Sequence, residues 1–163
     1  MCYETFKSSI TELRNDQQIQ YPFLLITGKP GTGKSEVLKH MIEHAVKEDC
    51  ETLVVCPTGY LTCSYQAIFG PSIKCDTVHS SFYIPVNKEY NATMNWNLCY
   101  YHVIIIDEVI FLKHCHYYVN ITKCTSLSQS IYILGKSNPS CVRKPYRSKH
   151  LVFAETPSRR FLR

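Results

Sequence analysis

Short apolar runs along the chain predict buried strands, and an amphipathic stretch predicts a helix between the first two. The runs cover residues 23–27, 52–56 and 102–106, and a further one covers residues 150–153. They are continuous rather than alternating, as in strands that are covered on both faces of a sheet. Residues 35–49 place apolar side chains at helical spacing. Because strands alternate with helical segments, the pattern predicts an α/β fold with a parallel sheet flanked by helices.

The other stretches carry weaker patterns. Residues 1–20 predict a short helix and a polar linker, residues 60–97 a helix and loops, residues 110–130 a helix, and residues 137–149 a loop. The chain has 163 residues, 45% of them hydrophobic, which is enough for one globular domain with its own core. No apolar run approaches the ~20 residues that a membrane helix needs, so we expect no membrane partner.

A glycine-rich segment directly after the first apolar run matches the phosphate-binding loop pattern G-x-x-x-x-G-K-[ST]. Its residues, all expected to bind the nucleotide, are Gly28, Lys29, Pro30, Gly31, Thr32, Gly33, Lys34 and Ser35. The glycines let the backbone form a nest of N–H groups around phosphate oxygens, and the helix that follows adds the positive end of its dipole. In this pattern Lys34 reaches the β- and γ-phosphates, and the Ser35 hydroxyl can ligate Mg²⁺. Strand, loop and helix together predict binding of a nucleoside triphosphate.

The run at residues 102–106 ends in two carboxylates, Asp107 and Glu108. An apolar strand followed by such a pair is the Walker B arrangement, and a parallel sheet delivers these side chains to its carboxyl edge, where ligands bind. We expect Asp107 to hold the phosphate-bridging Mg²⁺ with Ser35 or through water. Glu108 can orient the attacking water or accept its proton, which favours hydrolysis over transfer to a small molecule. Lys34, Asp107 and Glu108 are therefore the candidate catalytic residues.

The cysteines point to free thiols rather than to a disulfide framework or a zinc site. There are nine of them, none in a C-x-x-C pair. Free thiols are typical of a reducing, intracellular compartment. The sequence His114-Cys115-His116 has no second ligand pair nearby, so we expect no metal there.

Four segments together resemble motifs of superfamily 1 DNA helicases of the Pif/RecD-like branch. Residues 23–35 resemble motif I, residues 56–59 (Cys-Pro-Thr-Gly) motif Ia, residues 77–82 (Thr-Val-His-Ser-Ser-Phe) the segment after it, and residues 105–109 motif II. Order and spacing also match, and the likeness is greatest to Pif-type helicases of Helitron-like transposons and their cellular relatives. The resemblance spans residues 3–153 and implies a P-loop NTPase fold with a RecA-like sheet.

In that family, motif Ia and the Thr-x-His-Ser segment line the single-stranded DNA track. The resemblance therefore implies Thr58, Gly59 and His79 as DNA contacts, and a threonine hydroxyl and a glycine N–H are ordinary phosphate donors. From the residues alone, a buried, hydrogen-bonded His79 and a core-packed Phe82 remain open.

The activity implied by this resemblance is that of an ATP-dependent 5′–3′ DNA helicase in repair, recombination or transposition. ATP, Mg²⁺ and single-stranded DNA would be its substrate, cofactor and partner. We expect a monomer inside the cell, in the nucleus or the mitochondrion.

The chain departs from the family pattern upstream of the glycine loop. The adenine-reading glutamine of the family has no clear counterpart, because Gln17, Gln18 and Gln20 lie too close to Gly28. Adenine selectivity is therefore not predicted by the sequence.

A second departure follows residues 149–154, which resemble the strand leading into motif III. By resemblance this strand, with Phe153, is expected between the glycine-loop strand and the Asp107 strand. The family then continues Gly-Asp-x-x-Gln-Leu-Pro-Pro, whereas this chain reads Glu-Thr-Pro-Ser-Arg-Arg-Phe-Leu-Arg. We interpret this ending as out-of-frame sequence, and we expect residues 1–154 to form a partial helicase ATP-binding domain.

Basic residues are concentrated at the end of the chain. Residues 141–163 contain seven Lys and Arg against one Glu. We expect residues 155–163 to form a disordered basic tail.

The second RecA-like domain of the family, with its arginine finger, has no counterpart here, so we expect weak nucleotide binding, little hydrolysis and no unwinding by this chain alone. A non-catalytic nucleotide- or DNA-binding remnant, and a P-loop kinase or NTPase unrelated to DNA, remain alternatives.

Overall fold

A parallel sheet forms the centre of the molecule. The computed structural model describes residues 2–82, 96–108, 131–136 and 151–155. The strands are β1 (Phe23–Thr27), β2 (Thr52–Cys56), β3 (Lys74–Thr77), β4 (Val103–Ile106), β5 (Ile131–Lys136) and β6 (Leu151–Glu155). Within the described residues they form one six-stranded sheet in the order β3-β2-β4-β5-β1-β6, and every neighbouring pair is parallel. The predicted α/β fold with a parallel sheet is confirmed.

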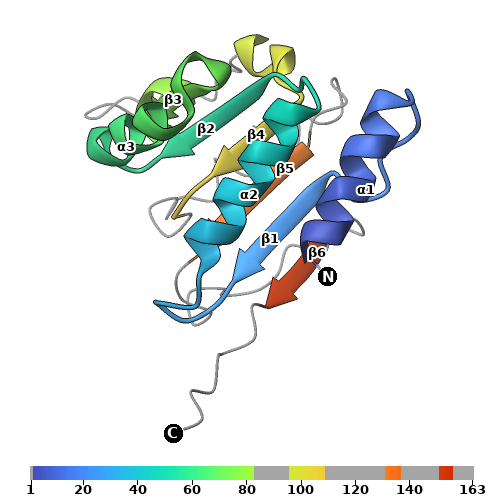
Figure 1. Cartoon of the computed structure of the whole chain (residues 1–163), viewed down its shortest axis with the longest axis horizontal. Coiled ribbons are helices and arrows are strands. Elements are labelled where there is room, and N and C mark those ends of the chain that lie inside the picture. The colour runs from blue at the N-terminus through green and yellow to red at the C-terminus, as the bar shows by residue number, and fades with distance from the viewer. Residues whose placement is uncertain (1, 83–95, 109–130, 137–150, 156–163) are drawn as a thin grey trace, which may run out of the picture.

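Helices cover this sheet. They are α1 (Cys2–Arg14), α2 (Lys34–Lys47), α3 (Gly59–Phe69) and the single turn α4 (Val78–Ser81), with short 3₁₀ segments η1 (Gly70–Ser72) and η2 (Trp96–Tyr100). Figure 1 shows α1, α2 and α3 in front of the sheet, with the strands running in one direction behind them. All the strand-to-helix turns therefore emerge at the same edge.

Alternate residues of each central strand serve two separate cores. On one face, Leu24, Val54 and Ile105 pack with buried side chains of α1 and α2. On the other face, Leu25 and Ile104 pack with residues of α4 and η2. Because side chains of a strand point alternately to the two faces, two covered faces require continuous apolar runs. This is why the predicted strands at β1 and β2 agree with the structure at both ends.

Helix α2 is held by a stripe of fully buried side chains on the sheet side: Leu38, Met41, Ile42 and Ala45. Each large apolar side chain buried in this way contributes about 1.5–3 kcal/mol relative to exposure. At the carboxyl end of α2, Glu48 forms an ion pair with Arg14 of α1, and 2.5 Å separate the nitrogen and the oxygen. This ion pair joins the ends of the two helices. The amphipathic pattern at residues 35–49 thus predicted this helix correctly.

Two strands were not predicted, and one was predicted in the wrong place. Strand β3 lies in the stretch expected to hold a helix and loops, and β5 lies in a stretch without a prediction. The strand with Phe153 was expected between β1 and β4, but β5 pairs with both of these strands and fills that position. Strand β6 therefore pairs with the other side of β1, in the register Leu25↔Phe153, at the edge of the described sheet.

Several predictions fall on residues that the structure does not describe. These are the helix at 110–130, the loop at 137–149, the residues His114 to His116 and residues 156–163 of the expected tail. Glu155, the first residue of that tail, lies in β6 instead. Among the helices that are described, none combines the length and the apolar character that crossing a membrane requires. The described cysteines are free thiols, as predicted.

Replacing Ile105 by alanine should test the central packing. Ile105 is 0% exposed in β4, between β2 and β5. We expect the free energy of unfolding to fall by about 2–5 kcal/mol, because the truncation leaves a cavity between sheet and helices. Urea denaturation measures the change. The matched control is Ile68→Ala on α3, where the side chain is 56% exposed and a change of no more than ~0.5 kcal/mol is expected. Equal losses in the two variants would contradict the assigned core.

Candidate functional site

The glycine loop joins the end of β1 to the start of α2, and its shape depends on two glycines. Gly31 and Gly33 have φ angles of +77° and +81°. A Cβ at either position would meet no atom within 4 Å, so the requirement for glycine comes from the backbone conformation itself. Gly33 is also the N-cap of α2. The left-handed turns direct the chain from the strand into the helix, as expected for a phosphate-binding nest.

Lys34 lies against the backbone of this loop. Its ammonium group donates to the carbonyl oxygens of Gly28 at 3.1 Å and Lys29 at 2.8 Å. The same Lys29 carbonyl accepts from the hydroxyl of Thr32 at 2.8 Å. The loop therefore closes around a positive charge at the first turn of α2, while Pro30 at its tip is exposed. A cation held in this way stands where a phosphate group can replace the carbonyl oxygens as its partner.

Asp107 directly follows β4 and is a buried carboxylate, 9% exposed. Its backbone N–H donates to Val55 at 3.0 Å, which extends the pairing of β4 with β2 by one residue. Its Oδ1 accepts from the backbone N–H of Glu108 at 2.9 Å, and its Oδ2 accepts from the hydroxyl of Tyr65 at 2.9 Å. No Lys, Arg or His in the described part of the chain forms an ion pair with it. A buried carboxylate in this situation is suited to receive a cation.

Tyr65 is a site residue that the sequence did not reveal. It lies on the buried face of α3 and is 4% exposed. Burial, and then the negative charge of Asp107, raises the pKa of its phenol far above the usual value, so the hydroxyl keeps its proton and donates it. A buried tyrosine needs a partner for its hydroxyl, which is the one signal that could have drawn attention to it. Nothing in the sequence identifies that partner, which lies 42 residues further on.

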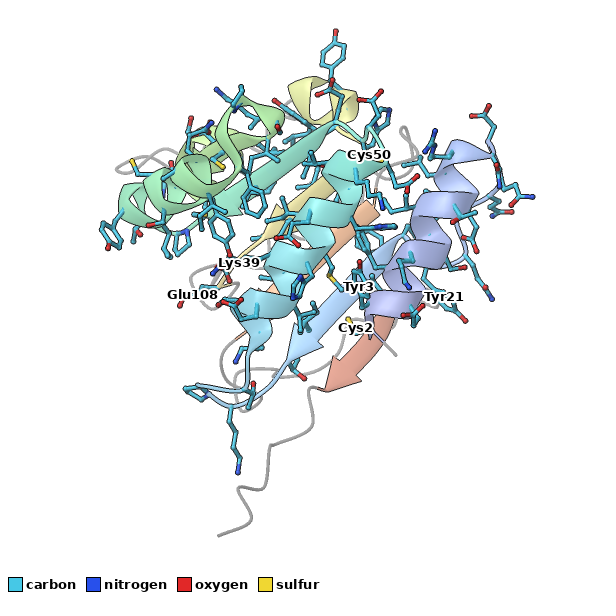
Figure 2. All side chains as sticks on the ribbon, in the orientation of Figure 1. Cys2, Tyr3, Tyr21, Lys39, Cys50 and Glu108 are labelled. Atoms are coloured by element: carbon cyan, nitrogen blue, oxygen red, sulfur yellow. The ribbon has the colours of Figure 1, made fainter. Side chains whose placement is uncertain are left out.

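Glu108 adopts a strained backbone conformation at the end of β4, with a φ of +52°. A non-glycine residue with such an angle is uncommon and occurs preferentially at functional sites. The turn is stabilised by the hydrogen bond from Glu108 N–H to Asp107. Figure 2 shows Glu108 at the carboxyl edge of the sheet, half-buried, on the side where the loop before α2 runs. The structure therefore places both predicted carboxylates at the edge that carries the glycine loop.

The loop and the carboxylates are separated by a single strand. β5 lies between β1 and β4, with Thr27 opposite Lys136 and Ile106 opposite Leu134. At the usual strand spacing, the ends of β1 and β4 are about 10 Å apart. The phosphate groups and cation of a bound nucleotide would lie between Lys34 on one side and Asp107 on the other.

The donor set fits Mg²⁺ better than a softer metal. The two residues expected to hold it are Asp107 and Ser35, which is exposed in the first turn of α2. Carboxylate and hydroxyl oxygens are ligands that Mg²⁺ prefers, and this ion is usually bound by one or two protein groups together with phosphates and waters. The described residues contain no cluster of three or more His, Cys, Asp or Glu side chains that could hold a metal alone.

The residues expected to contact DNA lie in two neighbouring turns at the same edge. β2 and β3 are adjacent and parallel, with Cys56 opposite Thr77. Thr58 and Gly59 follow β2 and are exposed, and Thr58 caps α3 by accepting from Leu61 N–H at 3.4 Å. A hydroxyl that accepts one hydrogen bond can still donate one to a phosphate.

The second of these turns follows β3 and carries His79 on α4. His79 is exposed, so the alternative of a buried histidine is wrong. Phe82, which follows α4, is 2% exposed and packs in the core. The alternative of a core-packed Phe82 is therefore confirmed. Of the two side chains, His79 alone is accessible to a partner.

Replacing Gly33 by alanine should destabilise the loop through its backbone conformation. The expected loss in the free energy of unfolding is about 1–2 kcal/mol, the cost of a left-handed conformation for a residue with a Cβ. Urea denaturation measures it. Gly59→Ala is the control, because Gly59 lies in the helix α3, lacks a positive φ and has no close neighbour. Alanine at Gly59 should leave the free energy of unfolding unchanged or raise it. A Gly33→Ala variant as stable as wild type would show that the loop adopts another conformation.

The thiol of Cys56, the last residue of β2, should be unreactive. Burial, reinforced by the negative charge of Asp107, raises the pKa of Cys56 to about 12. At pH 8 only roughly one molecule in 10,000 would then carry the thiolate, the form that reacts. We expect iodoacetamide to modify the exposed Cys63 at least ~10-fold faster than Cys56, measured by peptide mass spectrometry. The difference should disappear in urea. Equal rates in the native protein would contradict the burial of this region.

The chain matches one protein-family model, described as AAA domain, over residues 13–139, which is most of its length. No curated protein matches it significantly. Among solved structures, it is similar to a chain in the structure of C. elegans PCH-2, with 13% identity and a TM-score of 0.46. That match covers 95% of this chain and 40% of the other, so this chain spans less than half of its length. The family match covers β1, the glycine loop, Asp107 and Glu108. The chain therefore belongs to the AAA domain family, whose members are P-loop nucleotide-binding domains of the ATPase type.

Proposed function

We propose that the chain is the ATP-binding domain of an ATP-dependent DNA helicase of the Pif/RecD-like type. The observation that supports this most is the meeting of two kinds of group at one edge of the sheet. Lys34 and Asp107 provide phosphate and cation binding, while the turns with Thr58 and His79 present exposed polar groups beside them. The resemblance to helicase motifs supports the assignment of these turns to a DNA strand.

Each residue at the edge has a defined task in this proposal. The loop N–H groups and Lys34 bind the β- and γ-phosphates. Ser35 and Asp107 would hold Mg²⁺, which would neutralise phosphate charge and align the oxygens. Glu108 orients a water molecule and takes its proton as the water oxygen attacks the γ-phosphorus. The bond from this phosphorus to the bridging oxygen of ADP breaks, and the products are ADP and phosphate.

The DNA strand would cross the carboxyl ends of β2 and β3. The Thr58 hydroxyl, the Gly59 N–H and His79 would contact its backbone, which gives affinity without sequence preference. The turns after β2 and β4 lie next to each other, since these strands pair in the register Val55↔Ile106. A movement of the turn after β2 is therefore close enough to be coupled to the carboxylates.

Nucleotide binding and turnover of the wild-type chain and two variants test this proposal. Lys34→Ala should weaken binding of a fluorescent ATP analogue at least ~10-fold, because the cation that faces the phosphates is lost. The wild-type chain alone should release phosphate slowly, and Glu108→Gln should keep binding and lose this release, since it cannot accept the proton. A single-stranded oligonucleotide should stimulate release by the wild type, and this stimulation should be lost in both variants.

The control for these variants is Lys47→Ala, which removes the same charge at the opposite, exposed end of α2. It should bind and hydrolyse as the wild type does. Unchanged binding in Lys34→Ala would refute the nucleotide site. Turnover that does not respond to DNA would favour an NTPase unrelated to DNA, and binding without any turnover would favour a non-catalytic domain.

A further inference from the structure

The hydrogen bond between Tyr65 and Asp107 joins two parts of the edge that have separate tasks in the proposed function. The donor lies on α3, and the acceptor directly follows β4. The distance is 2.9 Å, and both side chains are buried. Water cannot easily replace either partner in such a place, so the bond determines where the carboxylate oxygen lies.

The two oxygens of this carboxylate have different partners, and Tyr65 is the side-chain partner of one of them. The other oxygen accepts from the backbone of Glu108, next to it in the chain. Tyr65 thus supplies a side-chain hydrogen bond to Asp107 from a helix that is distant in the chain.

Tyr65 is also fixed to the helix that begins at the expected DNA contact. α3 starts at Gly59 with Thr58 as its cap, and Tyr65 lies about 9 Å further along the helix axis. The ring of Tyr65 stacks on that of Phe69, with 6.4 Å between the centroids, one turn later. A displacement at the start of this short helix is therefore carried to the hydroxyl of Tyr65.

We propose that Tyr65 is a positioning residue that holds the Asp107 carboxylate for the divalent cation and ties its orientation to α3. Contact of a single strand with Thr58 and Gly59 would shift α3, and Tyr65 would pass this shift to Asp107. Cation affinity and DNA binding would then depend on each other, as linkage requires for two coupled sites. This inference rests on the proposed function, because it needs both a nucleotide-bound cation and a DNA strand.

Tyr65→Phe in the full chain tests the proposal, with Mn²⁺ binding in the presence of ATP followed by electron paramagnetic resonance. We expect Mn²⁺ affinity to fall about 10-fold, as for other residues that orient a metal ligand. Binding of a fluorescent ATP analogue in EDTA should not change. An oligo(dT) strand should shift Mn²⁺ affinity in the wild type and not in the variant. Tyr3→Phe is the matched control, because Tyr3 lies on α1 against His44.

A second variant separates positioning from a general effect on folding. In an Asp107→Asn background, Tyr65→Phe should have no further effect on Mn²⁺ affinity, because the two side chains act as one unit. The proposal would be overturned if Tyr65→Phe lowered Mn²⁺ affinity equally in the wild-type and the Asp107→Asn backgrounds. An unchanged Mn²⁺ affinity in the Tyr65→Phe single variant would also overturn it. Suppose that the wild type binds the nucleotide analogue and DNA, and that Tyr65→Phe has the same Mn²⁺ affinity and the same response to DNA. This inference then fails, while the proposed function stands. If the wild type binds neither, the proposed function fails and this inference fails with it.

Discussion

Parallel pairing of strands that are buried on both faces is the constraint on which the rest of this structure depends. A shift of one residue in register would turn Leu24 or Ile105 from one core to the other, so the alignment is strongly specified. Since all strands run in the same direction, every turn that follows a strand emerges at one edge. The glycine loop and Asp107 meet there although more than 70 residues separate them in the chain.

A left-handed glycine, a strained glutamate and a buried charge lie at this edge. Gly33 and Glu108 both have positive φ angles, and Asp107 is a buried carboxylate that is neutralised by no ion pair in the described part of the chain. The rest of the described sheet follows simple rules of burial and alternation. Such departures persist only where the surrounding structure enforces them, and they are typical of sites that bind ligands. The strained turn and the hydrogen bond from Tyr65 together hold the carboxylate in one orientation.

Much of the fold was predictable from local patterns, and the exceptions have physical reasons. Strands β1 and β2 and helix α2 are defined by continuous or periodic apolar residues, which burial on a sheet directly requires. Strand β3 was missed because Lys-Cys-Asp-Thr lacks an apolar run, and it becomes a strand by pairing with β2 and packing under α3. The order of β5 and β6 around β1 could not be predicted, since both sides of β1 offer the same hydrogen-bonding groups to a parallel strand.

The sequence by itself determined the chemistry of the candidate site. Spacing within the glycine loop and the position of Asp107 and Glu108 after an apolar run are local features, and local features specify which groups reach the carboxyl edge. Only the tertiary structure decided which of these groups are neighbours. It placed β5 rather than the Phe153 strand between β1 and β4, exposed His79, and gave Asp107 the hydroxyl of Tyr65. These outcomes depend on contacts between residues far apart in the chain, and the energy of such contacts comes from packing that no short segment contains.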